Sequence, residues 1–461
     1  MVNSHAPRLH SAIHAPRRPP GRYCKNLLTL ALVTLLSCSA HAAEPVYEFP
    51  LADLPFNTTH GGRFPSMAQS LALSQNYYQF AHIKIADALA DRSPGWFALS
   101  IVGFDILSTW VPLGDSWVHE EWHRAVLSSR GINSYDEINN FPLFSDAISV
   151  SHVTDEDLTT LKRDHPAELV RLHAAGLEAQ NEMNARLERD KFFNATRSFD
   201  GVLLWLNVSN TIGYLHTCAT PDANTFTDAF RNSEGSDISS RDFAGLDCTA
   251  WVYDLFHPNE LYSQRGTHPS GTGIDRYRAW RDLTGEEQNY LRRQRNMSLL
   301  NLVDPFLLGY NQFLASHPAT GTPLHWNTSL RHDLTPFGYA LSWNLFLRNA
   351  DRAAALALRY YAGHSTGGMG LELSLPRIFP DHTPMPLVVS ARLIAWQQPQ
   401  HQNFYAENTT LGGDLLIRLA QKRQRHWNPF VELEGKSAGW VAGNEYLGAN
   451  IALRAGVLIH Y

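Results

Sequence analysis

The amino-acid sequence predicts an α+β protein in which a helical N-terminal domain precedes an antiparallel β region. Apolar residues recur at helical spacing between residues 66 and about 315, and the apolar period changes to two after about residue 320. A chain of 461 residues is too long for one ordinary hydrophobic core, so two domains are expected. We therefore divide the chain into an N-terminal segment, a helical metal-binding domain and an antiparallel β domain, with bounds 1–42, 43–320 and 321–461.

The composition restricts the class of protein. A hydrophobic content of 44% is typical of a folded chain rather than a disordered one. Charged residues make up only 18%, below the usual quarter, and twelve tryptophans are present. This pattern suggests partial contact with lipid. The formal net charge of −6 does not favour nucleic acid as a partner.

The N-terminus has the pattern of an export signal. Basic residues precede a run of ten apolar residues at 27–36, and Ala40-His41-Ala42 matches a signal-peptidase site. Residues 1–42 are therefore expected to be a signal peptide, and an imperfect lipobox ending at Cys38 is the alternative. We expect an exported protein of the periplasm or outer membrane of a Gram-negative bacterium.

Several segments of the first domain are expected to be helical. The 155–193 stretch is charged and is interrupted at Pro166, whereas three other segments are strongly apolar. Each apolar segment carries interior polar residues such as Asp105 and Asp304, which favours buried core helices, with membrane-embedded helices as the alternative. The expected helices and apolar segments cover residues 67–91, 96–113, 117–130, 155–193, 199–216 and 297–315.

One short motif carries a specific chemistry. The run from His119 to His123 reads H-E-E-W-H, which matches the H-E-x-x-H pattern. On a helix, residues four positions apart lie on one face, so both imidazoles can bind one zinc ion. Glu120 is then the expected general base. Gly131 is expected to end this helix. The alternative is an amphipathic helix that carries two unrelated histidines.

A catalytic zinc ion needs a third protein ligand and an open coordination position. The sequence after His123 lacks the H-x-x-G-x-x-H extension, so the third ligand is expected on another helix. We expect Glu178, because Gly176 would let that helix approach closely. The alternatives are Asp247, Asp254 and His216.

Other polar residues are expected to support the metal ligands. Asp105 lies in an apolar run and could orient a ligand imidazole. His173 could contact the ligands or donate to the transition state, but its sequence context favours a hydrogen-bonded histidine on the helix surface. Glu182 shares a helix face with Glu178.

This region resembles membrane-associated gluzincins of the CAAX-prenyl-protease type, which pair H-E-x-x-H with a glutamate on a later helix. The resemblance covers residues 115–190 and implies a zinc metallopeptidase with a protein or peptide substrate. The E-x-x-x-D pattern of that family becomes Glu178-x-x-x-Glu182 here, so the supporting role of Glu182 does not carry over directly.

Two cysteines lie beyond the predicted signal peptide. In an oxidising compartment Cys218 and Cys248 could form a disulfide that closes a loop of about thirty residues. The alternative is a pair of buried free thiols.

The second domain is expected to contain eight strands. Alternation is clearest at the end, where the odd-numbered residues from Ile451 to Tyr461 form one apolar face. Gly363 to Gly367 matches the G-x-S-x-G esterase motif, but strands on both sides indicate a hairpin turn instead. The expected strands are 322–330, 336–348, 353–362, 367–377, 385–397, 411–420, 427–437 and 447–461.

An alternating final strand that ends in an aromatic residue resembles bacterial outer-membrane β-barrels. The resemblance implies contact with outer-membrane lipid and a β region that could close into a small barrel. The alternative is a soluble antiparallel sheet packed on the helical domain. Three functions follow. The first is a zinc-dependent hydrolase, with a peptidase preferred; the second is a non-enzymatic outer-membrane barrel or scaffold; and the third is a zinc-dependent lipid or acyl hydrolase.

Overall fold

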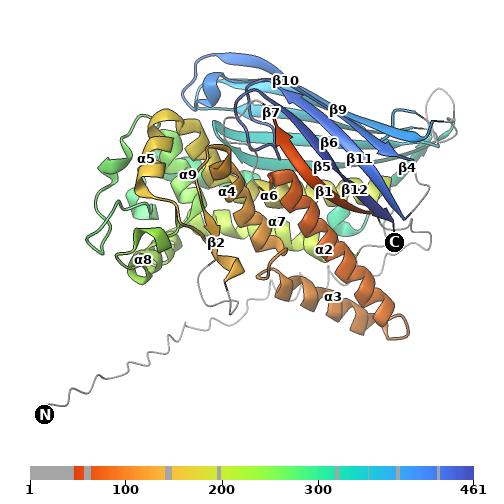
Figure 1. Ribbon diagram of the computed structural model, residues 1–461, viewed down its shortest axis with the longest axis horizontal. Helices are drawn as coiled ribbons and strands as arrows, with labels where there is room; N and C mark the ends of the chain where they lie inside the picture. The colour runs from red at the N-terminus through yellow and green to blue at the C-terminus, as the bar shows by residue number, and fades with distance from the viewer. Residues whose placement is uncertain are drawn as a thin grey trace, which may run out of the picture.

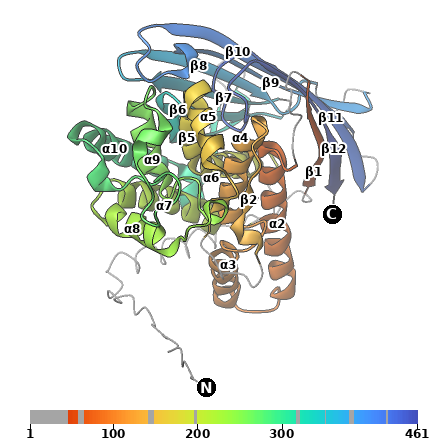
Figure 2. The same ribbon diagram turned by 60° about the vertical axis from the view of Figure 1, so that its left-hand side comes forward.

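The computed structural model combines a helical region with one large antiparallel sheet (Figure 1). It describes residues 46–56, 64–140, 148–194, 199–316, 321–350, 352–379, 385–422 and 426–460. The expected signal peptide and Cys38 lie outside these residues. Figure 2 shows the sheet as an arch, with the helices covering its concave side. The α+β class expected from the sequence is therefore confirmed.

Capping side chains determine where several helices begin. Ser66 and Gln69 form a reciprocal capping box at the start of the first helix, and Thr154 and Asp157 form another. Pro166 occupies the first turn of the longest helix, where its missing N–H costs nothing. The described residues contain α2 (Met67–Ala88), α3 (Pro94–Ser108), α4 (Asp115–Ser129), α5 (Asp155–Asp164), α6 (Pro166–Phe193), α7 (Gly201–Cys218), α8 (Asp222–Ser233), α9 (Asp247–Phe256) and α10 (Gly285–Ser298).

The apolar segment 297–315 does not form the continuous helix expected from its composition. It contains two short 3-10 helices, Leu299–Leu302 and Pro305–Leu308, followed by a strand. Asp304 caps the second of these by accepting a hydrogen bond from the Phe306 N–H. Proline and a capping aspartate therefore divide the segment into short turns. Among the described helices, none has both the length and the apolar character needed to cross a bilayer.

The sheet has ten strands and a simple order. Eight of them follow one another in the sequence and match the eight strands expected from the alternation. The turn at 363–366 joins two of them as a hairpin. The strands are β1 (Val46–Pro55), β4 (Phe313–Ser316), β5 (Pro323–Thr335), β6 (Gly338–Arg348), β7 (Ala353–Ala362), β8 (Gly367–Leu375), β9 (Leu387–Pro399), β10 (Thr409–Gln421), β11 (Trp427–Lys436) and β12 (Asn450–His460). A separate two-stranded ribbon pairs β2 (Tyr135–Asp136) with β3 (Val150–Ser151).

The first strand joins the sheet beside the last one. Strand β1 pairs antiparallel with β12, with Val46 opposite His460, and the sheet order runs from β1 through β12 down to β4. The expected domain boundary at residue 321 therefore does not separate the sheet from the rest of the chain, because β1 and β4 precede it.

The sheet is open, so the expectation that the β region could close into a small barrel is wrong. Its two edge strands, β1 and β4, do not pair with each other. Helix α2 covers the outer edge of β1 instead. The Asn76 amide bonds both the N–H and the C=O of Glu48, and the Gln69 amide donates to the carbonyl of Pro50. These side chains take the hydrogen bonds that a closing strand would make.

The two faces of the sheet have opposite chemistry. On the concave face, guanidinium groups of one strand pair with carboxylates of its neighbours, as in Arg359 with Glu372 (2.6 Å) and Arg392 with Asp414 (2.9 Å). Helix α6 lies against this face and adds its own ion pair, from Glu188 to Arg331 of β5. The convex face carries exposed leucines, among them Leu393, Leu415 and Leu433.

A buried histidine joins three helices below the sheet. His82 of α2 contacts Asp105 of α3 at 2.6 Å and Asp200, which precedes α7, at 3.1 Å. All three side chains are almost completely inaccessible to solvent. Burial alone would lower the pKa of His82, but the two carboxylates raise it to about 9.

This arrangement predicts a pH-dependent contribution to stability. Because the folded-state pKa exceeds the ordinary value of 6.5, the charged imidazole stabilises the fold fully below pH 6.5 and loses this effect as pH rises through about 9. The difference in free energy of unfolding between the wild type and His82→Gln should therefore shrink by about 3 kcal/mol between pH 6 and pH 9.5. Urea unfolding at both pH values measures it. A difference that is independent of pH would contradict the prediction.

Candidate metal centre

Helix α4 presents both motif histidines to the interior. His123 is almost fully buried and His119 is partly exposed, and their ring centroids lie 5.0 Å apart. Trp122, on the same helix, is completely buried and belongs to the main hydrophobic core. Gly131, with a φ of 72°, follows the end of α4, in the left-handed region that glycine adopts readily.

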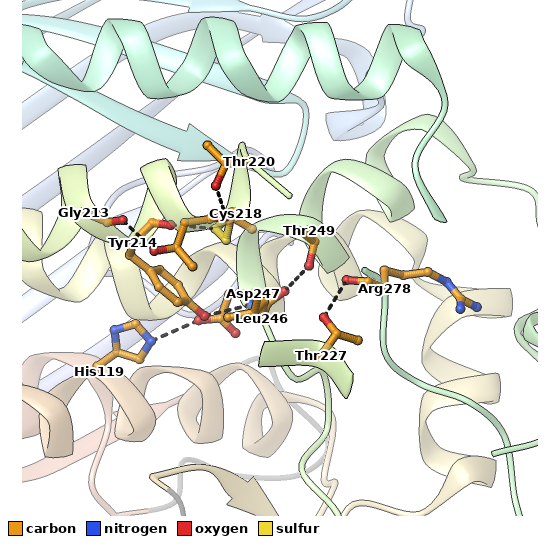
Figure 3. Close-up of a disulfide and its surroundings, with 12 residues drawn as sticks. His119, Gly213, Tyr214, Cys218, Thr220, Thr227, Leu246, Asp247, Thr249 and Arg278 are labelled. Carbon is orange, nitrogen blue, oxygen red and sulfur yellow. Dashed lines mark hydrogen bonds and ion pairs between the residues drawn. A yellow bond between two sulfur atoms is a disulfide. The ribbon is translucent and has the colours of Figure 1, made fainter. Parts of the chain in front are cut away.

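Asp247 completes a group of three ligand-type side chains. Its Oδ2 lies 3.1 Å from Nε2 of His119 and 3.4 Å from Nε2 of His123. The candidate ligand atoms of the three residues all lie within 4.8 Å of one another, close enough to bind one metal ion. Asp247 is the first residue of α9, and Figure 3 shows the His119 imidazole pointing toward it.

A hydrogen bond to the backbone orients the His123 imidazole toward the other two ligand-type side chains. Its Nδ1 donates to the carbonyl oxygen of Leu172 on α6 at 2.6 Å. This bond places one ring proton on Nδ1 and turns Nε2 toward Asp247. Nε2 of His123 is buried and makes no hydrogen bond in the described part of the chain, as expected for a metal-binding nitrogen.

The electrostatics of the site favour a cation. Burial raises the pKa of Glu120 well above its ordinary value, and nearby Asp136, Asp247 and Asp242 raise it further. Burial would also raise the pKa of Asp247, but the two imidazoles hold it below its usual range. Several carboxyl groups therefore share a buried region, and a divalent cation would offset their mutual repulsion.

Two contacts from α7 hold Asp247 in position. The backbone N–H of Asp247 donates to the hydroxyl of Tyr214 at 2.9 Å, and the ring of Tyr214 packs edge-on against His119. The next residue, Cys248, forms a disulfide with Cys218 at the end of α7. Figure 3 shows the disulfide, Tyr214 and Asp247 side by side. The expected cysteine pair thus fixes the start of α9, which carries the third ligand-type side chain.

A glycine allows α6 to pass beside the site. A Cβ atom added at Gly176 would lie 2.1 Å from Nε2 of His119, far inside van der Waals contact. The close approach expected from the sequence is therefore present, and it is directed at a metal-ligand candidate.

Glu178, the expected third ligand, lies outside the group. Its carboxylate accepts hydrogen bonds from Arg171 (2.9 Å), from the indole of Trp440 (3.1 Å) and from the backbone N–H of Gly443 (2.9 Å). These contacts tie α6 to the loop between β11 and β12. The structure thus favours Asp247, an alternative in the sequence analysis, in place of Glu178.

The expected supporting residues have other partners. Asp105 contacts His82 rather than the motif histidines. His173 donates from Nε2 to Asp254 at 2.9 Å and stacks on Phe243, whose ring also contacts His123. Glu182 lines a small cavity between α6 and the sheet. Two further ligand alternatives are also placed: Asp254 binds Lys162 and Arg265, and His216 is exposed on α7.

Comparisons with protein-family models, with curated proteins and with solved structures find no match to this chain. No family is therefore identified. The geometry defines a helical region with a His-His-Asp group able to hold a metal ion, followed by a ten-stranded antiparallel sheet.

The contact at Gly176 predicts a variant that damages the site without removing a ligand. Gly176→Ala should displace the His119 imidazole and weaken the binding of a divalent metal ion about 10–100-fold, which is typical of disturbed ligand orientation. Alanine favours the helix by about 1 kcal/mol, so loss of helix α6 is not expected. Competition with a chromogenic chelator measures the affinity.

Gly213→Ala on α7 is the matched control, because a Cβ there meets no atom within 4 Å. Its zinc affinity should equal that of the wild type. Equal affinities for both variants and the wild type would show that α6 does not constrain the site.

The disulfide predicts a second effect on the site. Replacing both Cys218 and Cys248 with alanine frees a loop of 30 residues and should lower the free energy of unfolding by about 3–4 kcal/mol. Zinc affinity should fall as well, because the start of α9 loses its covalent anchor. Urea unfolding and metal analysis measure the two effects. A thiol reductant should lower the free energy of unfolding and the metal affinity of the wild type as well. An unchanged metal affinity would show that the disulfide does not position the site.

Proposed function

We propose that this protein is a zinc-dependent hydrolase whose metal is held by His119, His123 and Asp247. The observation that supports the proposal is the convergence of three ligand-type side chains at a helix that also carries Glu120. Two imidazole nitrogens and one carboxylate oxygen form a donor set that zinc prefers, and three protein ligands are typical of catalytic zinc.

The exposure of the three side chains supports a catalytic rather than a purely structural site. His119 is 13% exposed, whereas His123 is 1% and Asp247 is 6% exposed. A substrate therefore approaches from the His119 side, while the other two ligands are shielded from water. Structural zinc sites instead are closed by four protein ligands.

The residues of the chain have distinct roles in the proposed reaction. Zinc, when bound, lowers the pKa of a coordinated water and polarises the substrate carbonyl. Glu120 would act as the general base that accepts one proton from the attacking water. It would then give this proton to the departing amine or alkoxide, so that one water is consumed and the Glu120 carboxylate is regenerated.

We propose a peptide bond as the substrate, because H-E-x-x-H helices with an adjacent glutamate base are characteristic of metallopeptidases. An acyl ester is the second candidate. The exposed apolar convex face of the sheet favours it, since such a face would bring the enzyme close to lipid.

An oxidising compartment is part of this proposal. The disulfide between Cys218 and Cys248 supports it, because structural disulfides persist in exported proteins and are rare in the cytosol. We therefore propose that the protein acts in the periplasm or at the outer membrane of a Gram-negative bacterium.

Metal analysis with matched variants tests the proposal. The wild type should contain about one zinc per chain, and His119→Ala should lose it. Glu120→Gln should keep the metal but lose about 10²–10⁴-fold in turnover of a cleaved peptide or ester, the usual contribution of general acid–base catalysis. Inductively coupled plasma mass spectrometry and a mixed peptide and ester substrate screen supply the measurements.

Asp247→Asn and Glu178→Gln distinguish the two candidate third ligands. The first variant should lose zinc and the second should keep it, with near-ultraviolet circular dichroism confirming that both remain folded. Zinc loss in Glu178→Gln alone would overturn the assignment of Asp247. No zinc in the wild type, purified without chelator, would overturn the hydrolase proposal.

A further inference from the structure

The outward side chains of strands β7 to β12 form one continuous surface, which we call the apolar face. Register places Leu373, Leu393 and Leu415 in one row across the sheet, and Leu433 and Leu453 in the next row on the same face. Many of these side chains are exposed in the chain as it stands. Those at least 39% exposed are Leu358, Tyr360, Met369, Leu371, Leu387, Leu393, Leu411, Leu415, Ile417, Leu419, Trp427, Val431, Leu433 and Ile451.

The apolar face carries no charged residue on these six strands. The register places every charged side chain of the six strands on the concave face, for example Arg418 opposite Glu432 and Glu432 opposite Arg454. A soluble sheet places its charges toward water and its apolar side chains toward the protein. This sheet has the reverse arrangement, so its convex face requires an apolar partner.

Basic residues gather at one end of the apolar face. The hairpins between β6 and β7, β8 and β9, and β10 and β11 all lie at this end, and they carry Arg352, Arg377 and Lys422. The turns at the opposite end, 336–337, 363–366, 400–408 and 437–449, contain no lysine or arginine. By sequence, the hairpins at the first end contain five lysines and arginines and two aspartates, whereas the turns at the opposite end contain two glutamates, so the two ends differ in the sign of their net charge.

We propose that the apolar face is a lipid-contact surface, immersed in the acyl chains of a bilayer with its basic end at anionic headgroups. The sheet arches outward (Figure 2), so a second rigid copy would touch it along a narrow line, whereas fluid acyl chains conform to the curve. Anionic headgroups complement the basic hairpins. A bilayer with anionic headgroups therefore complements both the curved apolar surface and the basic hairpins at its end.

The open sheet indicates which strands enter the lipid most deeply. Sheet edges with unpaired backbone groups do not occur in hydrocarbon, so the edge strands remain at the level of the headgroups. The central strands β8 to β10 form the crown of the arch and make the deepest contact. Leu411 of β10, which is 81% exposed, belongs to this crown.

Vesicle flotation of the purified full chain tests the proposal. The protein should float with vesicles of phosphatidylcholine and phosphatidylglycerol at 3:1, and less completely with phosphatidylcholine alone. The difference should disappear at high salt, because screening weakens headgroup attraction. A wild type that stays at the bottom with both vesicles would overturn the proposal.

Matched variants locate the contact. Replacing Leu393, Leu411 and Leu415 together with threonine keeps β-forming residues and should reduce the floated fraction at least tenfold. Phe226→Thr with Leu261→Thr removes equally exposed apolar side chains from the helical region and should leave flotation unchanged. Equal effects of the two sets would overturn the assignment of the apolar face.

A labelled variant covers the case in which the triple variant fails to fold. Leu411→Cys carrying an environment-sensitive fluorophore should shift its emission to shorter wavelength when vesicles are added. An unshifted emission in floated protein would place the contact elsewhere.

The double variant Arg352→Gln with Arg377→Gln tests the basic end of the face. It should float equally with both vesicle types. An unchanged preference for phosphatidylglycerol would show that these hairpins do not contact anionic headgroups.

A second copy of the chain is the competing partner. Sedimentation equilibrium without lipid would reveal a dimer of the chain. If the triple threonine variant abolished such a dimer, and if the wild type did not float with vesicles, the lipid proposal would be overturned. The proposal does not depend on the metal centre. Glu120→Gln and zinc-free protein should float like the wild type.

Discussion

Helix α6 contacts the metal helix on one side and the charged face of the sheet on the other. Gly176 lets it pass beside His119, and the Leu172 carbonyl orients His123. More than three turns further along the helix, Glu188 pairs with Arg331 of β5. A buried helix can hold this position only if each polar group meets a partner, because an unpaired buried charge costs several kcal/mol. Helix α6 therefore links the metal centre to the charged face of the sheet.

The concave face of the sheet illustrates how such a charged interior is stabilised. Arg454 contacts Asp53 of β1 at 2.9 Å and Glu434 of β11, so three strands share one guanidinium group. Arg392 similarly contacts Asp414 and Glu434, both at 2.9 Å. Guanidinium groups suit this role because they present several donors in a fixed plane and remain charged. The network specifies strand register, since slipping one strand by a residue would separate its charges from their partners.

Local periodicity accounts for what the sequence predicts well. Alternation over β5 to β12 identified all eight strands within a few residues, and the H-E-x-x-H spacing identified the two histidines that face one ligand-type carboxylate. Strand β1, with the sequence VYEFPLADLP, was missed because two prolines and an interior glutamate interrupt its pattern. Its pairing with β12 is supported by Arg454, which contacts Asp53 from the other end of the described chain.

The third ligand-type residue could not be singled out from a sequence pattern, because only a tertiary contact brings it beside the two histidines. Asp247 is 128 residues from His119 and begins a short helix of its own, with no spacing rule to connect them. Glu178 had the more suggestive neighbourhood, beside Gly176, but Arg171, Trp440 and Gly443 already satisfy its carboxylate. The adjacent Cys248 was the available signal, because a disulfide to Cys218 fixes Asp247 beside the helix that carries Tyr214.

The pairing of β1 with β12 has a consequence for the order of folding. Val46 pairs with His460, so the first and last strands in the sequence lie side by side and enclose nearly all of the described residues. During synthesis β1 is made first, yet its partner strand emerges last, and until then its backbone donors and acceptors lack their sheet neighbours. Long-range pairing of this kind slows folding and prolongs the exposure of unpaired strands. The Asn76 and Gln69 contacts from α2, which follows β1 directly, give this strand local partners while the rest of the sheet is still being made.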